Sequence, residues 1–252
     1  MHDFTFKSLI LLHYIFKKMN FKKLIFYVKI PLLFVIIMWV IKLIEIKFNL
    51  SFIDLGVLPR RLSGLKGILF SPIIHKDINH LINNSSPVLI LGSLLFFFYY
   101  KIRYKLLGWL YITSGLFLWS IGRDSFHIGA SGLIYALAGF IFFSGLIRNN
   151  KRLSALSLVV IFIYGSMFWG VFPTYEHVSW EGHLSGLVAG LILAIYFKNE
   201  GPKKDIYQWE IDEENEENER NEGHEGHEGH EGHEGNNKNE NEIQINYNYI
   251  EK

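Results

Sequence analysis

The sequence predicts an all-α, polytopic membrane protein in which six helices form a bundle and a disordered C-terminal tail follows. Half of the 252 residues are apolar, and most of them fall in runs close to the roughly 20 residues that a helix needs to cross a bilayer. Charge is divided along the chain, since residues 1–199 carry 20 basic and 7 acidic side chains, whereas residues 200–252 carry 5 and 17. A basic apolar body suits a membrane protein beside anionic lipid, and an acidic tail poor in apolar residues favours disorder.

The elements follow one another simply along the chain. Residues 1–23 are predicted to form a cytoplasmic or interfacial segment, because lysines follow a short apolar stretch there. The membrane domain is expected over residues 24–198 and the acidic tail over residues 199–252. Residues 46–79 contain proline, glycine and arginine among apolar residues, which predicts a long loop lying partly in the interface. The six predicted spans are 24–44, 80–100, 105–122, 129–147, 153–172 and 182–197.

Lysine and arginine in the connections predict the orientation of these spans. They gather between spans two and three, between spans four and five, and after span six: Lys101, Arg103, Lys105, Arg148, Lys151, Arg152, Lys198, Lys203 and Lys204. Both termini are therefore expected in the cytoplasm. The first residues lack the pattern of a secretory or organelle-targeting leader, so the expected location is a bacterial-type plasma (inner) membrane.

Polar side chains open three of the spans at one membrane depth. In the predicted orientation spans two, four and six all begin at the outer face, and four polar residues stand at these beginnings: His80, Asn84, Ser131 and His183. Polar groups inside a span are costly and mark candidate functional sites. Their shared level predicts a site in the outer leaflet.

Ser131 and His183 are the candidate catalytic pair. A serine hydroxyl attacks a carbonyl carbon only when a base accepts its proton, and an imidazole is well suited to that task. The two residues lie far apart in the sequence, so only packing of spans four and six can join them. Glycine residues on one face of each span allow the two backbones to approach closely, although ordinary helix packing would use the same glycines. They are Gly182, Gly186 and Gly190 on span six, and Gly132 and Gly139 on span four.

The surroundings of Ser131 predict stabilisation of negative charge. Ser131 stands at a helix N-terminus, where free N–H groups and the helix dipole favour an anion. His80 and Asn84 are four residues apart, hence on one face of span two, and both can donate hydrogen bonds. We expect them to form an oxyanion hole with the Ser131 amide, and helix caps or interface residues are the alternative. Tyr135 is expected either to stack on the His183 ring or to serve as a core residue.

No cofactor or metal ion is expected at this site, and nucleic acid is not an expected partner. The chain has no cysteine and no His-Glu-x-x-His helix, so the remaining candidate ligands make an unlikely metal set: His75, His80, His127 and His177. The tail repeats Gly-His-Glu four times over residues 223–234. A solvated low-complexity tail is the first interpretation, with weak metal capture by its histidines as the second: His224, His227, His230 and His233.

Three motifs, in order along the chain, resemble those of the rhomboid intramembrane serine proteases over about residues 45–197. They are His75, His80 and Asn84, similar to the family's second-span motif; Gly129, Ala130, Ser131 and Gly132 with Tyr135, similar to its nucleophile motif; and His183 with Gly186 and Gly190, similar to its base-bearing helix. The family's Trp-Arg pair is absent from the first loop, where Arg60-Arg61 stands instead.

The resemblance implies a six-helix rhomboid-like bundle with a Ser131–His183 dyad and a structural role for His75. It implies an oxyanion hole made by His80, Asn84 and the Ser131 amide. The implied reaction is hydrolysis of peptide bonds in or beside the transmembrane segments of membrane-protein substrates, without a cofactor. A catalytically silent rhomboid-like protein that binds membrane clients is the alternative, and a transporter is disfavoured because no repeat symmetry is evident.

Overall fold

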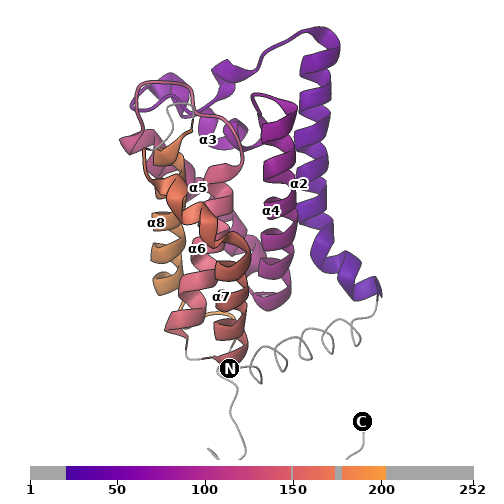
Figure 1. The fold of residues 1–252 in the computed structure, drawn as a ribbon, viewed down its shortest axis with the longest axis vertical. Helices are drawn as coiled ribbons and strands as arrows, with labels where there is room; N and C mark the ends of the chain where they lie inside the picture. Colours follow the sequence, from indigo (N-terminus) through magenta and orange to yellow (C-terminus); the bar gives the residue numbers. More distant parts are fainter. Residues whose placement is uncertain (1–20, 149, 174–177, 203–252) are drawn as a thin grey trace, which may run out of the picture. The chain divides into compact units, whose positions relative to one another are not determined.

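The computed structural model describes residues 21–148, 150–173 and 178–202, and this part of the chain is helical without a β-strand (Figure 1). Its longer helices are α2 (Phe21–Phe48), α4 (Ile78–Phe98), α5 (Arg103–Ile121), α6 (Ser131–Ile147), α7 (Lys151–Tyr164) and α8 (Trp180–Tyr196). Shorter turns are η1 (Ile53–Leu55), η2 (Leu62–Gly64), α3 (Gly67–Phe70), η3 (Ser71–Ile73) and η4 (Gly165–Val171). Residues 1–20 of the predicted interfacial segment and residues 203–252 of the predicted acidic tail lie outside the described residues.

Two predicted elements need correction. The span expected over 153–172 is α-helical only to Tyr164, after which the chain tightens into the 3₁₀ segment η4. Glycine is a poor residue for the interior of an α-helix. Gly165 is the first residue of η4, and Gly170 lies near its end. The loop expected over 46–79 begins later, because α2 continues to Phe48, and it contains four short helical turns instead of irregular chain.

Side-chain caps fix where two helices of the candidate site begin. Asp77 precedes α4 and accepts a hydrogen bond from the His80 amide at 2.8 Å. Ser179 precedes α8 and accepts one from the Gly182 amide at 3.3 Å. Aspartate and serine are preferred at these positions because they pair with amides that the first turn leaves free. Both caps therefore place a histidine, His80 or His183, in the first turn of its helix.

The helices pack closely where glycine faces a neighbour. Figure 1 shows α2 alongside α4, and α6 packs against α4, α5, α7 and α8. A Cβ atom at Gly92 of α4 would lie 2.9 Å from Pro31 Cγ of α2. A Cβ atom at Gly190 of α8 would lie 2.6 Å from the Ala136 carbonyl oxygen of α6. Small residues thus let backbones approach, as is typical of helix pairs in membranes.

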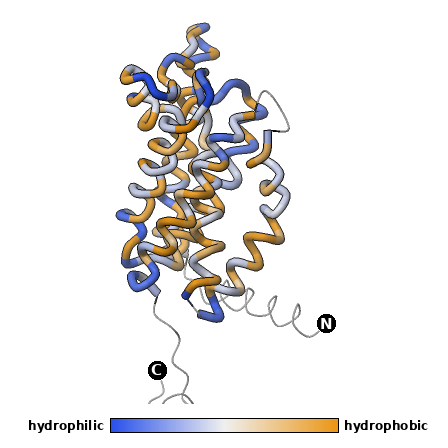
Figure 2. Tube along the Cα trace, turned by 90° about the vertical axis from the view of Figure 1, so that its left-hand side faces the viewer, coloured by the Kyte–Doolittle hydropathy of each residue, from blue (hydrophilic) through white to orange (hydrophobic). Residues whose placement is uncertain are grey.

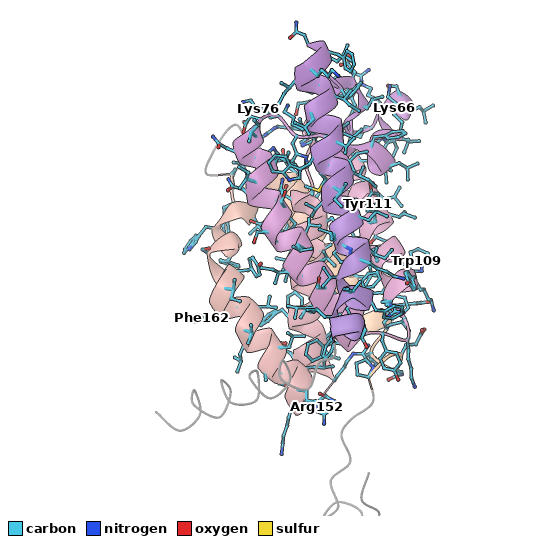
Figure 3. The ribbon with its side chains drawn as sticks, turned by 90° about the vertical axis from the view of Figure 1, so that its right-hand side faces the viewer. Lys66, Lys76, Trp109, Tyr111, Arg152 and Phe162 are labelled. Atoms are coloured by element: carbon cyan, nitrogen blue, oxygen red, sulfur yellow. The ribbon has the colours of Figure 1, made fainter. Side chains whose placement is uncertain are left out.

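Apolar side chains cover much of the outside of the described bundle. Hydrophilic residues gather toward its two ends (Figure 2), and Phe162 of α7 projects outward, 90% exposed (Figure 3). Within the described residues, α2 from Leu24 and α4 are long and apolar enough to cross a membrane, whereas α6 and α8 are apolar but shorter. An extended exposed apolar surface of this kind suits contact with lipid.

Candidate active site

Ser131 is the first residue of α6. Two residues before it stands Gly129, which two side chains approach closely. Gly129 has a φ of +107°, which disfavours any residue with a side chain. A Cβ atom there would lie 2.8 Å from His80 Nε2 and 3.5 Å from Asn84 Nδ2. The residues that sequence reasoning placed on span two and span four therefore meet directly before Ser131.

Asn84 carries a buried donor that has no partner. Its side chain is 5% exposed, and its Nδ2 atom makes no hydrogen bond within the described structure. Leaving a buried polar group unpaired costs about 1–3 kcal/mol. A cost of this kind is expected at functional sites, where the missing acceptor arrives with the ligand.

His75 supports the same region from the loop before α4. It is 2% exposed, its ring packs edge-on against the His80 ring with centroids 5.0 Å apart, and its Nε2 accepts a hydrogen bond from the Ala130 amide at 3.4 Å. Burial, followed by the neighbouring His80 and Lys42, lowers the pKa of His75 to about 3. His75 is thus a neutral residue that joins the start of α4 to the residue before Ser131.

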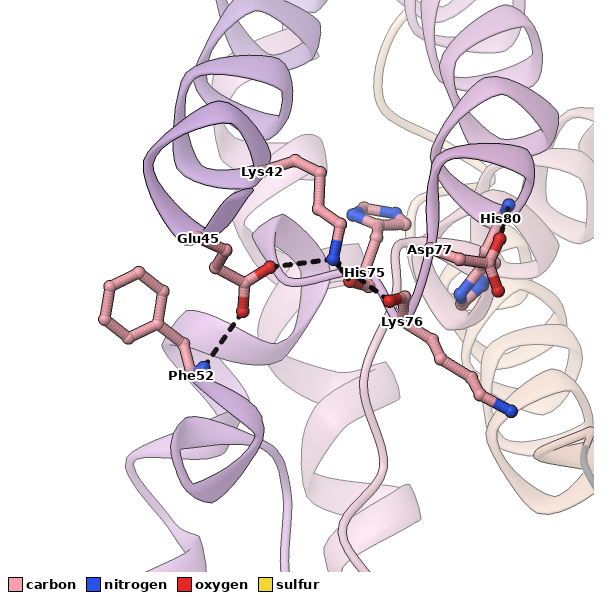
Figure 4. A network of polar contacts seen from close by, with 7 residues as sticks. All are labelled: Lys42, Glu45, Phe52, His75, Lys76, Asp77 and His80. Carbon is pink, nitrogen blue, oxygen red and sulfur yellow. Dashed lines mark hydrogen bonds and ion pairs between the residues drawn. The ribbon is translucent and has the colours of Figure 1, made fainter. Parts of the chain in front are cut away.

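A partly buried ion pair on α2 anchors the backbone of His75 (Figure 4). Lys42 Nζ donates to the carbonyl oxygens of His75 at 2.9 Å and Lys76 at 3.0 Å, and it lies 3.0 Å from Glu45 Oε2. Glu45 Oε1 also accepts a hydrogen bond from the Phe52 amide at 2.9 Å. Sequence reasoning missed this network, because two charges near the end of an apolar helix ordinarily indicate only the membrane surface.

Replacing Lys42 with methionine is expected to lower the free energy of unfolding by about 3–5 kcal/mol, because the buried Glu45 carboxylate would lose its cation. Two carbonyl oxygens would lose a charged donor as well. Thermal unfolding of the purified protein in detergent measures the effect. The matched control is Lys47→Met on the exposed face of the same helix, where a change within about 0.5 kcal/mol is expected. Equal stability of the two variants would contradict an anchoring role for Lys42.

Acidification is expected to destabilise the fold through His75. The folded-state pKa of His75, about 3, lies below its ordinary value of 6.5, so the unfolded chain takes up the proton first. The stability that neutral His75 contributes is complete above pH 6.5 and is lost as the pH falls toward 3, with a slope of up to about 1.4 kcal/mol per pH unit. Unfolding curves between pH 7.5 and pH 4 measure this slope, which should be shallower in His75→Gln. Identical slopes in the wild type and in His75→Gln would contradict this contribution of His75 to stability.

His183 is held on two sides. Its ring stacks on the Tyr135 ring with centroids 4.2 Å apart and planes 9° apart, which is the stacking expected from the sequence. Its Nδ1 lies 2.8 Å from the carbonyl oxygen of Gly170. A carbonyl only accepts hydrogen bonds, so Nδ1 carries the proton of the neutral ring and Nε2 keeps a free lone pair. Sequence reasoning missed Gly170 altogether.

The N-terminal ends of α6 and α8 lie against each other. A Cβ atom at Gly132 would lie 3.3 Å from the Gly182 carbonyl oxygen, and one at Gly186 would overlap the Gly132 carbonyl oxygen. The direct neighbours of Ser131 and His183 are therefore in contact, and Tyr135, one turn after Ser131, touches the His183 ring. The glycine faces predicted on the two spans face each other.

The loop before Ser131 is tied to the cap of α8. His127 Nδ1 lies 2.7 Å from Ser179 Oγ, and its Nε2 lies 3.1 Å from the Arg123 carbonyl oxygen. Arg123 also donates to the Val178 carbonyl oxygen at 3.0 Å and pairs with buried Glu181 at 3.7 Å. Burial lowers the pKa of His127, which favours the neutral form of its ring. Sequence reasoning weighed His127 only as a metal ligand; the structure buries it, together with Glu181.

A small cavity of about 30 Å³ opens beside Ser131. Its lining includes Ser71, Ser114 and His127, and Gly182 closes it on the side of α8. Most of its wall is apolar, but these side chains supply polar groups, and a cavity of this size has room for about two water molecules. Within the described residues no group of three or more histidine, aspartate or glutamate side chains could hold a metal ion, and the histidine repeat of the tail lies outside them.

Comparison with known proteins identifies the class. Residues 63–200 match the family model of the rhomboid domain. Uncharacterized proteins of Mycobacterium bovis and Mycobacterium tuberculosis are 35% identical over 173 residues, which cover 65% of this chain and 72% of each relative. An uncharacterized protein of Mycobacterium leprae is 31% identical over 172 residues, covering 65% of this chain and 68% of the relative.

The chain belongs to the rhomboid family, whose members are embedded in membranes and are generally intramembrane serine proteases. The match begins at residue 63, so α2 with its Lys42–Glu45 pair precedes the matched region.

Proposed function

We propose that this protein is an intramembrane serine endopeptidase that hydrolyses peptide bonds in or near the transmembrane segments of membrane proteins. It acts as a multi-pass protein of the plasma (inner) membrane with both termini in the cytoplasm, without a cofactor. Its partners are transmembrane substrates and the lipid bilayer. The observation that carries the proposal is the orientation of His183, whose Nδ1 is paired with the Gly170 carbonyl oxygen. Its Nε2 makes no hydrogen bond among the described residues and stands at the end of α8 that contacts the start of α6.

The reaction begins with attack of Ser131 Oγ on the scissile carbonyl carbon while its proton passes to His183 Nε2. The tetrahedral intermediate bears a negative oxygen. The Asn84 side-chain amide, the His80 ring and the Ser131 backbone amide donate to that oxygen. Asn84 Nδ2 supports this role, because a donor that has no acceptor among the described residues is free for the intermediate.

Breakdown of the intermediate breaks the carbon–nitrogen bond as His183 returns its proton to the leaving amine. Water then attacks the acyl-enzyme ester, with His183 accepting its proton, and the new carboxyl group leaves as Ser131 regains its hydrogen. The cavity beside Ser131, which has Ser71, Ser114 and His127 in its wall, supports this step, since a hydrolase in a membrane needs water within reach. Tyr135 and Gly170 keep the imidazole oriented through both proton transfers.

The test is cleavage of a single-span reporter, with a small residue near the outer end of its span, by the purified protein in proteoliposomes. Mass spectrometry of the products locates the hydrolysed bond. New termini in or beside the span support the proposal. Stable capture of the reporter without hydrolysis, at any pH from 5 to 9, would instead identify a catalytically silent client-binding protein.

A further inference from the structure

Among the described residues, no carboxylate makes a hydrogen bond to the base of the proposed dyad, although serine hydrolases commonly use such a partner. In a Ser-His-Asp triad the carboxylate binds Nδ1–H, holds the imidazole in one tautomer and stabilises the imidazolium. Among the residues described, the hydrogen-bond acceptor at His183 Nδ1 is the Gly170 carbonyl oxygen, at 2.8 Å. A peptide carbonyl is a neutral acceptor, but it fixes the same tautomer because it has no proton to donate.

We infer that Gly170 is a positioning residue of this protease, whose main-chain carbonyl orients His183 in the place of a triad carboxylate. The inference rests on the proposed function and goes beyond it, because it assigns a role to a segment outside the predicted motifs. Gly170 lies near the end of η4, 13 residues before His183. The tighter 3₁₀ winding after α7 turns its carbonyl oxygen toward α8.

The residue has to be glycine because the backbone approaches two rings. A Cβ atom at position 170 would lie 3.0 Å from His183 Nδ1 and would overlap the Tyr135 hydroxyl oxygen. The same two rings stack on each other, so a methyl group there would push on the stack from its edge. Gly170 does not have a positive φ, so alanine there is excluded by these contacts and not by backbone strain.

The other glycine of η4 provides a matched control. A Cβ atom at Gly165 would lie 3.9 Å from Ile161 Cγ2, which is an ordinary van der Waals distance. Gly165→Ala and Gly170→Ala therefore make the same chemical change in the same 3₁₀ segment. They differ in whether the new methyl group meets His183 and Tyr135.

Steady-state cleavage of the single-span reporter is the first measurement. Gly170→Ala is expected to lower kcat by about 100-fold or more with KM within about 3-fold, because a misplaced base affects the chemical step and not substrate binding. Gly165→Ala is expected to keep both constants within about 3-fold. A Gly170→Ala enzyme with wild-type kcat would overturn the inference.

A double variant separates His183 from Tyr135. Tyr135→Phe removes the hydroxyl that a methyl group at position 170 would overlap, and leaves the 3.0 Å contact with His183 Nδ1 in place. If Gly170 acts on His183, the loss of kcat in Gly170→Ala persists in the Tyr135→Phe background. Restoration to the rate of Tyr135→Phe alone would show that Gly170 only makes room for the tyrosine, which contradicts the inference.

Nitrogen-15 NMR of histidine-labelled protein supplies a readout that does not depend on proteolysis. The His183 signals are assigned by difference from His183→Gln. In the wild type above pH 8 we expect a protonated Nδ1 and an unprotonated Nε2, and in Gly170→Ala a mixture of tautomers. A protonated Nε2 in the wild type would overturn the inference. If the wild type shows the expected tautomer but cleaves no reporter, the proposed function fails while the Gly170 contact stands. If Gly170→Ala does not fold, the wild-type spectrum alone decides.

Discussion

Cleavage of a single-span reporter is expected to fall by about 10⁴- to 10⁶-fold when Ser131 is replaced by alanine. The loss is this large because no other group would form the covalent intermediate. His183→Ala should cost about as much, since a serine without a base stays protonated at neutral pH. The double variant should be no worse than either single one, because residues that act as a unit do not contribute additively.

Rates of product formation in proteoliposomes measure these losses. Ser93→Ala is the matched control, since the Ser93 hydroxyl donates to the Leu89 carbonyl oxygen of its own helix at 2.6 Å. That variant should cleave at the wild-type rate. Undiminished cleavage by either Ser131→Ala or His183→Ala would remove the dyad, and clearly additive losses would show that the two residues act in separate steps.

Asn84→Ala and His80→Ala are each expected to slow cleavage by about 10- to 1000-fold, the usual effect of removing one oxyanion donor. A substitution at Asn84 is also expected to change the stability of the protein. Within the described part of the chain, Asn84 Nδ2 is buried without a partner, so an apolar residue of similar size, as in Asn84→Leu, relieves an unpaired polar group. Asn84→Leu should therefore lose rate and gain about 1–2 kcal/mol of stability, the exchange expected where a site holds an unfavourable group for function.

Kinetics and thermal unfolding of the same preparations measure both effects. The neighbouring Asn83 is exposed, and Asn83→Ala should change neither the rate nor the unfolding temperature appreciably. A loss of activity as complete as that of Ser131→Ala, together with lower stability, would mean that Asn84 supports the fold and is not an oxyanion donor.

The helices and the residues at their beginnings were predictable because both have local causes. Runs of apolar residues of membrane length predicted α2, α4, α5, α6 and α8 within a few residues. The orientation expected from lysine and arginine requires α4, α6 and α8 to begin at one end, and the contacts of Gly129 with His80 and of Gly132 with Gly182 bring those beginnings together. The catalytic roles of the residues gathered there stay predictions.

Other features had no local signal. The break of the fifth predicted span at Gly165 was missed because apolar periodicity continues through η4 and hides the change of winding. Lys42 and Glu45 were missed because their partners are backbone atoms 33 residues or more and 7 residues away. His127 was considered only as a metal ligand, because the residues around it in the sequence do not indicate its contact with Ser179, which lies 52 residues later.

The sequence by itself determined the class of the fold, the approximate positions of most helices, and which side chains carry the candidate chemistry, because hydrophobic length, charge bias and residue type are properties of short segments. The tertiary structure alone decided how His183 is oriented. Its Nδ1 partner is the carbonyl oxygen of Gly170, a group that every residue possesses and no residue type announces. A backbone carbonyl acquires a specific role only when the packing of distant segments directs it toward a partner. In this protein that packing is the contact of α8 with α6 and with η4.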